Sequence, residues 1–529
     1  MIIDANSIED SDILQAEICI LGGGVAGIIL ANELLNSNKS IILLESGGEM
    51  YNNKTQELYK AESTPPHFPN PHFSRLRFLG GSSNHWENSI ERLSPIDFKK
   101  REWVRDSGWP ITYDEVARFY PDAEDYCNVG GDGYDFNFWK KKLKSDDAFL
   151  ASDSFNSVVS KSPLIPTHFY SQHSEKLKNS NNIRIIKNSN IIDLEYDKET
   201  QIVQSVTFRT LQNIQKKVYA KKFVMCLGGI ENARMLLLFN EKFENTLGNR
   251  SDNVGRYFME HPTIRAAHLL PFYEYYLDKI YYDGTMDKGL HIRARASLSE
   301  DAQTKYRTNN LRMYFSKQSK LTLSDGVSSA HIISDSLQSN ELPNNFGEHL
   351  LNALQDIDHI SESLLKQEFD VSLFDDVHRF GGFQIISMIE QTPDRNNRIS
   401  LGHEKDQLGL KKIKIDFRIT QSDKDSAWKT LELFAKDPGI QLLGRVRLLK
   451  ERENRIWGSQ LGFGQHHIGT TRMSHTAEKG VVDSNLKVFG TKNFYISGSS
   501  VFPTGGHVPP TLTIIAITIR LAHELRSNV

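Results

Sequence analysis

The sequence is poor in cysteine, in net charge and in long apolar runs, and each shortage excludes a class of protein. Three cysteines in 529 residues exclude a disulfide framework and a thiolate metal site, and we expect no metal. Lys and Arg number 63 against 66 Asp and Glu, a formal charge of −3, so no nucleic-acid partner is expected. No apolar run reaches the roughly 20 residues that span a bilayer.

Targeting signals and repetitive segments are also missing. Residues 1–15 are polar and acidic, without the basic and apolar regions of a secretory signal. Cys19 and Cys226 lie in apolar runs, which predicts buried, inert thiols. These features favour a cytoplasmic protein without a membrane span, and the length predicts two to four domains.

What the sequence does contain is a βαβ unit near its N-terminus. Residues 17–21 (EICIL) read as a buried strand, residues 25–36 as a helix and residues 40–44 (SIILL) as a second strand. Three glycines with the spacing Gly-x-Gly-x-x-Gly separate the first strand from the helix, namely Gly22, Gly24 and Gly27.

This spacing predicts a dinucleotide site. Gly22 permits the tight turn, Gly24 lets a phosphate approach the backbone, and Gly27 lets the helix pack on the strand. The helix N-terminus offers free N–H groups to the pyrophosphate. Glu45, at the end of the second strand, is expected to bind the ribose hydroxyls. The motif alone does not distinguish FAD from NAD.

The middle of the chain is less regular. Residues 222–227 read as a buried strand that leads into a glycine pair at 228–229. Segments 293–298, 383–390 and 412–419 read as strands of an antiparallel sheet. Residues 346–366 read as an amphipathic helix, whose apolar stripe we expect in the core: Leu350, Leu354, Ile357, Ile360 and Leu364.

Further motifs at both ends narrow the interpretation. Residues 78–86 (FLGGSSNHW) are followed by 107–111 (SGWPI), and residues 465–473 (QHHIGTTRM) lead to 494–513 (FYISGSSVFPTGGHVPPTLT). Together they resemble the glucose–methanol–choline (GMC) oxidoreductase family, nearest its bacterial branch of pyranose oxidases and sugar or polyol dehydrogenases. The resemblance extends to residues 228–234.

The resemblance implies an α/β chain (α+β overall) with a discontinuous, Rossmann-like FAD-binding domain and a substrate domain with a mainly antiparallel sheet. The FAD-binding domain would comprise residues 1–95, 180–262 and 460–529. The substrate-binding domain and covering segments would comprise residues 96–179 and 263–459.

The resemblance also implies catalytic residues. His466, three residues before Gly469, matches the family's histidine that takes the proton of the substrate hydroxyl while hydride passes to flavin N5. An unperturbed pKa of about 6.5 suits that role. His507 is the candidate partner. The Asn of sugar oxidases falls on Pro509, which has no side-chain donor or acceptor, so either His507 pairs with His466 alone or the chain departs from the usual pair. His467 and residues 253–262 are expected to be structural.

The cofactor implied is FAD. At the position of His85, relatives either bond the flavin 8α carbon covalently or pack a histidine against the dimethylbenzene edge, and we expect the second. The same resemblance assigns cofactor contacts to Gly80, Gly81, Ser82, Asn84, His85, Ile191, Gly498, Ser499 and Thr511.

The implied function is oxidation of an alcohol group on a sugar, glycoside or polyol, with oxygen, a quinone or a protein as electron acceptor. Two alternatives remain open at this point. One is a non-redox lyase on the same flavin fold, and the other is a flavin-binding protein with impaired catalysis. A nicotinamide dehydrogenase would leave residues 78–86 and 465–513 unexplained.

Overall fold

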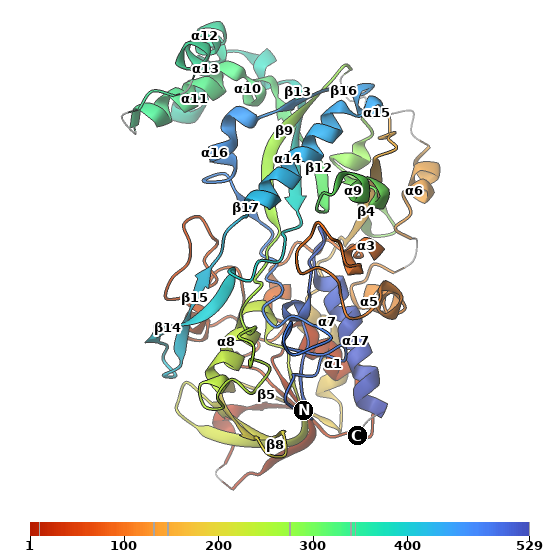
Figure 1. Cartoon of the computed structure of the whole chain (residues 1–529), viewed down its shortest axis with the longest axis vertical. Coiled ribbons are helices and arrows are strands. Elements are labelled where there is room, and N and C mark those ends of the chain that lie inside the picture. The colour runs from red at the N-terminus through yellow and green to blue at the C-terminus, as the bar shows by residue number, and fades with distance from the viewer. Residues whose placement is uncertain are drawn as a thin grey trace.

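The computed structural model describes residues 1–9, 11–130, 133–144, 148–273, 277–338, 341–343 and 345–527. The chain forms two lobes, each around its own sheet, and both termini lie in the lower lobe of Figure 1. Each sheet has its own hydrophobic core. The predicted fold class, a largely parallel sheet combined with an antiparallel one, is confirmed.

The first sheet is assembled from both ends of the chain and a central segment. Its order is β1–β5–β3–β2–β8–β7–β6, with β18 beside β8. The ladders from β1 to β8 and between β8 and β18 are parallel, whereas β6 and β7 pair antiparallel. The strands are β1 Ile2–Asp4, β2 Leu14–Leu21, β3 Ile41–Leu44, β5 Ile183–Lys187, β6 Asn190–Asp197, β7 Ile202–Arg209, β8 Gln215–Met225 and β18 Phe494–Ile496.

Helices cover the first sheet, and this explains why its central strands do not alternate between polar and apolar residues. All four residues of β3 and the last four of β2 are buried, as in parallel sheets covered on both faces. Helix α1 (Val25–Glu33) packs against α17 (Thr511–Ser527), and α8 (Gly228–Asn240) follows β8 directly. The predicted βαβ unit is thus β2–α1–β3.

The second sheet is antiparallel and lies in the upper lobe of Figure 1. Its order is β10–β11–β12–β13–β9–β16, with β4 beside β11 and β17 beside β9. Helix α14 (Gln421–Lys436) packs into its core. The strands are β4 Phe155–Pro163, β9 Pro262–Pro271, β10 Thr285–Asp287, β11 Leu290–Leu298, β12 Leu311–Ser319, β13 Phe380–Ile389, β16 Gly444–Leu448 and β17 Gly462–Phe463.

Residues 398–416 differ from expectation. Strand β15 (Lys411–Asp416) pairs with β14 (Arg398–Lys405) in a separate two-stranded ladder, and Lys414 forms an isolated bridge with Ser63. Ile399, Ile413 and Ile415 belong to the core of the first sheet, because the ladder lies against α8. A strand pattern in sequence does not reveal which sheet the strand will join.

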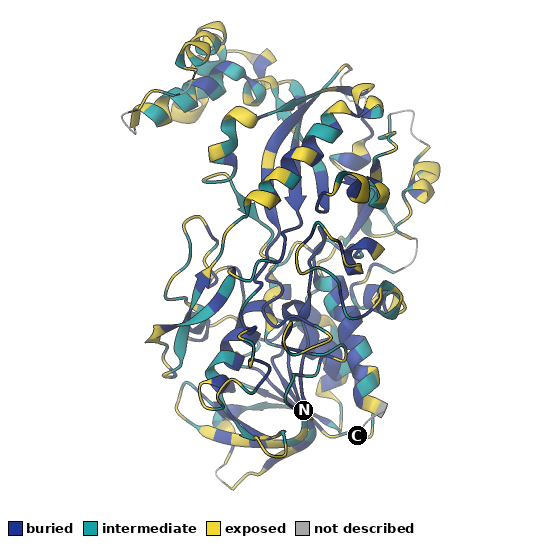
Figure 2. Ribbon diagram, viewed as in Figure 1, coloured by how far each residue is buried: buried dark blue, intermediate teal, exposed yellow. Residues whose placement is uncertain are grey.

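The placement of residues 346–366 in the core is wrong. They form two helices, α12 (Phe346–Gln355) and α13 (Ile357–Phe369), that meet at Asp356. Leu350, Leu354 and Ile357 are 43%, 59% and 60% exposed, and Figure 2 shows much of this region as exposed. An apolar stripe is buried only where another element faces it, and neither core extends to these helices.

Among the helices of the described residues, none has both the length and the apolarity to cross a bilayer.

Candidate active site

The glycine loop connects β2 to α1. Gly22 has φ +108°, and a Cβ there would lie 2.7 Å from the Cys226 carbonyl oxygen. A Cβ at Gly27 would lie 1.9 Å from the Gly22 carbonyl oxygen. A Cβ at Gly24 would meet no atom within 4 Å. Two glycines therefore permit backbone packing, and the third borders open space.

Glu45 directly follows β3 and is buried. Its two carboxylate oxygens accept hydrogen bonds from Gly23 N (2.7 Å) and Gly47 N (2.8 Å). A carboxylate has about four lone-pair positions, so capacity remains for the ribose hydroxyls. The Glu45 carbonyl also accepts Ser189 N at 2.8 Å, which places the start of β6, with Ile191, beside it.

The predicted loop at 78–86 lies against the glycine loop. Gly80 N donates to Gly23 O (2.8 Å), and a Cβ at Gly81 would lie 3.3 Å from Gly24 Cα. The Asn84 amide donates to Leu79 O and Gly81 O, both at 3.0 Å, so it braces its own loop. The residues Ser82 and His85 are exposed.

Three glycines border open space at the carboxyl ends of neighbouring parallel strands. Gly24, Gly228 and Gly498 follow β2, β8 and β18, and an added Cβ would meet nothing within 4 Å at the first two and only Asn232 Nδ2, at 3.9 Å, at the third. Each precedes or opens a helix, where backbone N–H groups favour phosphate. This cradle, which side chains would fill, fits the diphosphate of FAD at the sheet edge where such ligands bind.

Two other predicted contact residues adjoin this edge. Ser499 opens the short helix η7 (Ser499–Val501) after Gly498, and its hydroxyl donates to His467 O at 2.7 Å. Thr511 is the first residue of α17. The first sheet therefore gathers the predicted cofactor contacts from the two chain ends and the middle.

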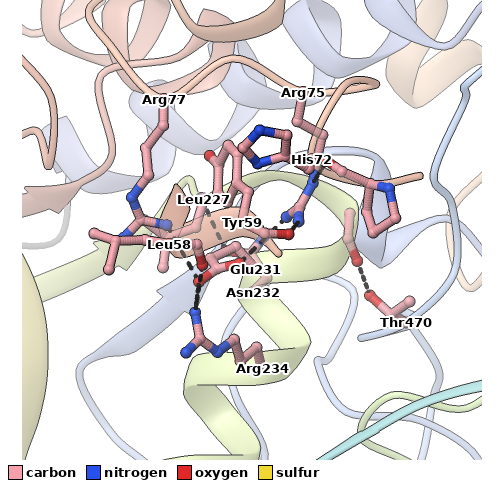
Figure 3. A network of polar contacts seen from close by, with 12 residues as sticks. Leu58, Tyr59, His72, Arg75, Arg77, Leu227, Glu231, Asn232, Arg234 and Thr470 are labelled. Carbon is pink, nitrogen blue, oxygen red and sulfur yellow. Dashed lines mark hydrogen bonds and ion pairs between the residues drawn. The ribbon is translucent and has the colours of Figure 1, made fainter. Parts of the chain in front are cut away.

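A buried network of ion pairs holds the chain segment that leads into the 78–86 loop (Figure 3). Glu231 on α8 pairs with Arg75 (3.2 Å), Arg77 (3.3 Å) and Arg234 (2.8 Å). Burial alone would raise the pKa of Glu231, but the three guanidinium groups hold it at about 2. Arg75 and Arg77 also contact the Tyr59 ring. The network anchors residues 75–77, just before Gly80, to α8.

An antiparallel pairing brings together two histidines that are 205 residues apart. Met259 and Ile468 exchange two backbone hydrogen bonds of 3.0 Å, and β17 pairs with the start of β9. As a result His261 Nδ1 lies 2.8 Å from His466 Nδ1. His261 Nε2 lies 2.9 Å from the Gly506 carbonyl oxygen.

These contacts determine which ring nitrogens carry hydrogen. The Gly506 carbonyl can only accept, so His261 Nε2 donates to it. Burial lowers the pKa of His261 to about 4, so its ring is neutral near pH 7 and Nδ1 is an acceptor. His466 Nδ1 must then be the donor. Burial and the neighbouring His261 also hold the pKa of His466 well below its usual range, which leaves its Nε2 unprotonated.

Glu260 holds the backbone of both histidines. One carboxylate oxygen accepts from His261 N (3.1 Å) and His466 N (3.0 Å), and the other lies 3.5 Å from His467 Nε2. Burial raises the pKa of Glu260 to about 7. The segment predicted to be purely structural thus includes the direct partner of His466. The sequence does show a histidine directly before Pro262, but its position in the chain gave no reason to pair it with His466.

His507 contacts a different group of residues. It is 2% exposed, and its Nε2 lies 3.5 Å from Glu91 Oε1. Glu91 pairs with Arg312 at 2.6 Å. The residue before His507, Gly506, supplies the carbonyl to His261. The structure therefore connects His507 to His466 through the backbone of Gly506 and the ring of His261.

Comparisons with known proteins find relatives among flavin oxidoreductases. Residues 393–518 match the family model described as GMC oxidoreductase. The chain is 22% identical to the fructose dehydrogenase large subunit of Gluconobacter japonicus, over 98% of this chain and 99% of that protein. It is 27% identical to the C-glycoside 3-oxidase of Arthrobacter globiformis, over 25% of this chain and 24% of that protein.

Solved structures share the fold at low sequence identity. The pyridoxine 4-oxidase from Mesorbium loti has a TM-score of 0.55 at 15% identity, covering 97% of this chain and 99% of that one. An FAD-dependent oxidoreductase from Chaetomium thermophilum has the same TM-score, identity and coverage.

Proposed function

The chain belongs to the GMC oxidoreductase family and is a flavin oxidoreductase acting on CH–OH donors, and on that premise we propose that its substrate is a sugar, glycoside or polyol and that His466 is the catalytic base. The relatives named for fructose and C-glycosides support the substrate class. The His466–His261–Gly506 hydrogen-bond chain supports the base.

The proposed proton transfer uses only groups of this chain. The unprotonated Nε2 of His466 accepts the proton of the substrate hydroxyl as the C–H bond at the same carbon breaks. FAD, when bound, supplies the acceptor for that hydride. His261 keeps its lone pair on His466 Nδ1–H and so stabilises the imidazolium that His466 becomes. Gly506 holds His261 in the required tautomer.

The same geometry disfavours an enzyme with impaired catalysis. A neutral histidine with an oriented tautomer is competent as a base even though Pro509 provides no polar side chain. The partner that relatives supply near the C-terminus is not needed to orient His466, because His261 does so from the start of β9.

Anaerobic mixing with sugars, glycosides, polyols and simple alcohols tests the substrate class. We expect at least one sugar or polyol to bleach the flavin absorbance, and simple alcohols to do so more slowly. A preparation that no carbohydrate reduces, but that a simple alcohol reduces readily, would contradict the substrate class. Reoxidation by oxygen and by a quinone then distinguishes an oxidase from a dehydrogenase.

His466→Ala tests the base. The rate of flavin reduction by the best substrate should fall by roughly two to four orders of magnitude, the usual contribution of a general base. FAD content and the melting temperature should stay near those of the wild type, because the substitution leaves the backbone hydrogen bond from His466 N to Glu260 in place. Unchanged reduction in a protein with full FAD content would assign the base to another residue.

A further inference from the structure

A helical arm projects from the second lobe. We use this name for the described residues of 325–376, which form α11 (Asp325–Gln338), α12 and α13. In Figure 1 the arm lies beyond the second sheet, at the end of the molecule opposite the termini. It is attached through α10 (Lys320–Leu323) and by ion pairs of Arg447 with Asp325 and of Arg455 with Asp335.

The arm does not bury its apolar side chains within this chain. Neither hydrophobic core includes a described residue of the arm. Of the 25 large apolar residues that are exposed in the described chain, eleven lie in the arm, although it is only a tenth of the sequence (Figure 2). They include Leu337 (57%), Leu351 (54%), Leu354 (59%), Ile357 (60%), Leu364 (56%) and Phe369 (71%).

Packing of α11 against α12 and α13 and several polar contacts hold the arm together. The buried Glu362 carboxylate accepts hydrogen bonds from Leu373 N (2.8 Å) and Ser372 Oγ (2.5 Å) and contacts His378 Nε2 (2.6 Å). Asp356 accepts from Ser324 Oγ (2.6 Å) and Gly326 N (3.0 Å). Isolated helices of 10 to 14 residues are marginal in water, so the three helices depend on packing against one another, and covering the exposed apolar side chains would stabilise the arm further.

Charge indicates what covers it. Residues 325–376 contain eleven acidic side chains and one lysine, a formal charge of −10 with neutral histidines. The whole chain carries −3, so the remainder carries +7. Two arms packed against each other would repel, as would an arm at an anionic membrane. The body of another copy of this chain is the complementary surface.

We propose that the arm is a self-association element, whose apolar face docks on the positively charged body of a second copy of this chain. In a two-fold dimer each arm contacts the partner's body and each body receives the partner's arm. A specific interface buries about 800 Å² on each partner. The eleven exposed apolar side chains of the arm can supply an area of this size. The arm contains none of the site residues.

Sedimentation of the FAD-loaded protein tests the proposal. The wild type should be a dimer at micromolar concentration. L351D/L354D should be monomeric, and its dissociation constant should rise at least a hundredfold. L351M/L354M is the matched control, because it changes the same two positions but keeps the apolar face, and it should remain dimeric. A monomeric wild type, or a double variant that dimerises as tightly as the wild type, would overturn the proposal.

Two further measurements distinguish a specific loss of the dimer from misfolding and from binding to a membrane. The double variant should keep its flavin spectrum and its rate of anaerobic flavin reduction. If it misfolds, the milder D358K/E368K, which reverses two charges and leaves the apolar side chains in place, should weaken the dimer at least tenfold. Raising salt should weaken the wild-type dimer, since opposite charges meet. Flotation of monomeric wild type with neutral phosphatidylcholine vesicles would instead identify a lipid surface and refute the dimer.

Discussion

His261 decides which nitrogen of His466, the proposed base, carries the hydrogen. The two Nδ1 atoms are 2.8 Å apart, and the lone pair of His261 keeps the hydrogen of His466 on Nδ1. We expect His261→Phe to slow flavin reduction about tenfold to a hundredfold, the usual effect of losing an orienting partner, while FAD binding is unchanged. Stopped-flow reduction measures this, with His467→Asn as control. Equal effects of the two substitutions would argue against the orienting role.

As the proposed base, His466 sets the expected acid limit of the reaction. Burial and the proximity of His261 lower its pKa well below 6.5, so the neutral base persists as the pH falls. Flavin reduction should therefore stay constant between pH 8 and pH 6 and decline only at more acid pH. Stopped-flow rates across pH 5 to 8 check this. A rate that halves near pH 6.5 would show that the base titrates like an exposed histidine.

Glu260 makes stability depend on pH in a defined direction. Its pKa is about 7 in the folded protein against an ordinary 4.5, so the folded state binds the extra proton. Its contribution is fully present below pH 4.5 and is lost as the pH rises through 7, a change of about 3 kcal/mol. Urea unfolding at pH 5 and pH 8 should show wild type losing more stability than Glu260→Gln. Parallel losses would contradict the assignment.

At the scale of elements, the glycines of the loop after β2 are expected to have different roles, one in helix packing and one in cofactor binding. A Cβ at Gly27 would lie 1.9 Å from a backbone oxygen, whereas one at Gly24 would enter open space. Gly27→Ala should therefore destabilise the apoprotein by about 1–3 kcal/mol or more. Gly24→Ala should leave apoprotein stability within about 0.5 kcal/mol but weaken FAD binding at least tenfold. Denaturation and FAD titration separate the two; tight FAD binding by Gly24→Ala would move the pyrophosphate elsewhere.

The sequence predicted best those elements that contact their own neighbours in the chain. The unit β2–α1–β3 was predictable because a strand, a glycine turn and a helix of fixed spacing specify one another locally. Helices α12 and α13 were predicted as a single helix and as core, because periodicity reveals a helical face but not whether anything covers it. The same limit applies to β15, whose partner β14 is decided by packing against α8.

At the scale of the whole molecule, buried ion pairs join the lobes around His507. Arg101 binds Glu390 through two contacts of 2.7 and 2.5 Å, with side chains 1% and 0% exposed. Asp97, four residues before Arg101, accepts from Asn310 of the second lobe (3.1 Å), and its carbonyl accepts from Thr504 of the C-terminal segment (2.8 Å). The cluster therefore holds three distant segments in register.

Loss of one partner should be costly. Arg101→Met leaves the Glu390 carboxylate buried without its cation, which typically costs about 3–5 kcal/mol. Lys60→Met removes the exposed pair with Glu57 and should cost under about 1 kcal/mol. Urea denaturation of the two variants measures the difference. Similar small losses would mean that the other buried charges compensate for the missing guanidinium.

The sequence by itself determined the glycine loop, the parallel strands around it, the resemblance to the GMC family and the histidine motif, because each is encoded by residues close together in the chain. Only the tertiary structure decided that His466 bonds to His261, that Gly506 fixes the tautomer of both rings, and that the stripe from Leu350 to Leu364 faces outward. Contacts between residues 205 or 245 positions apart depend on how strands pair and lobes meet, which no local pattern specifies.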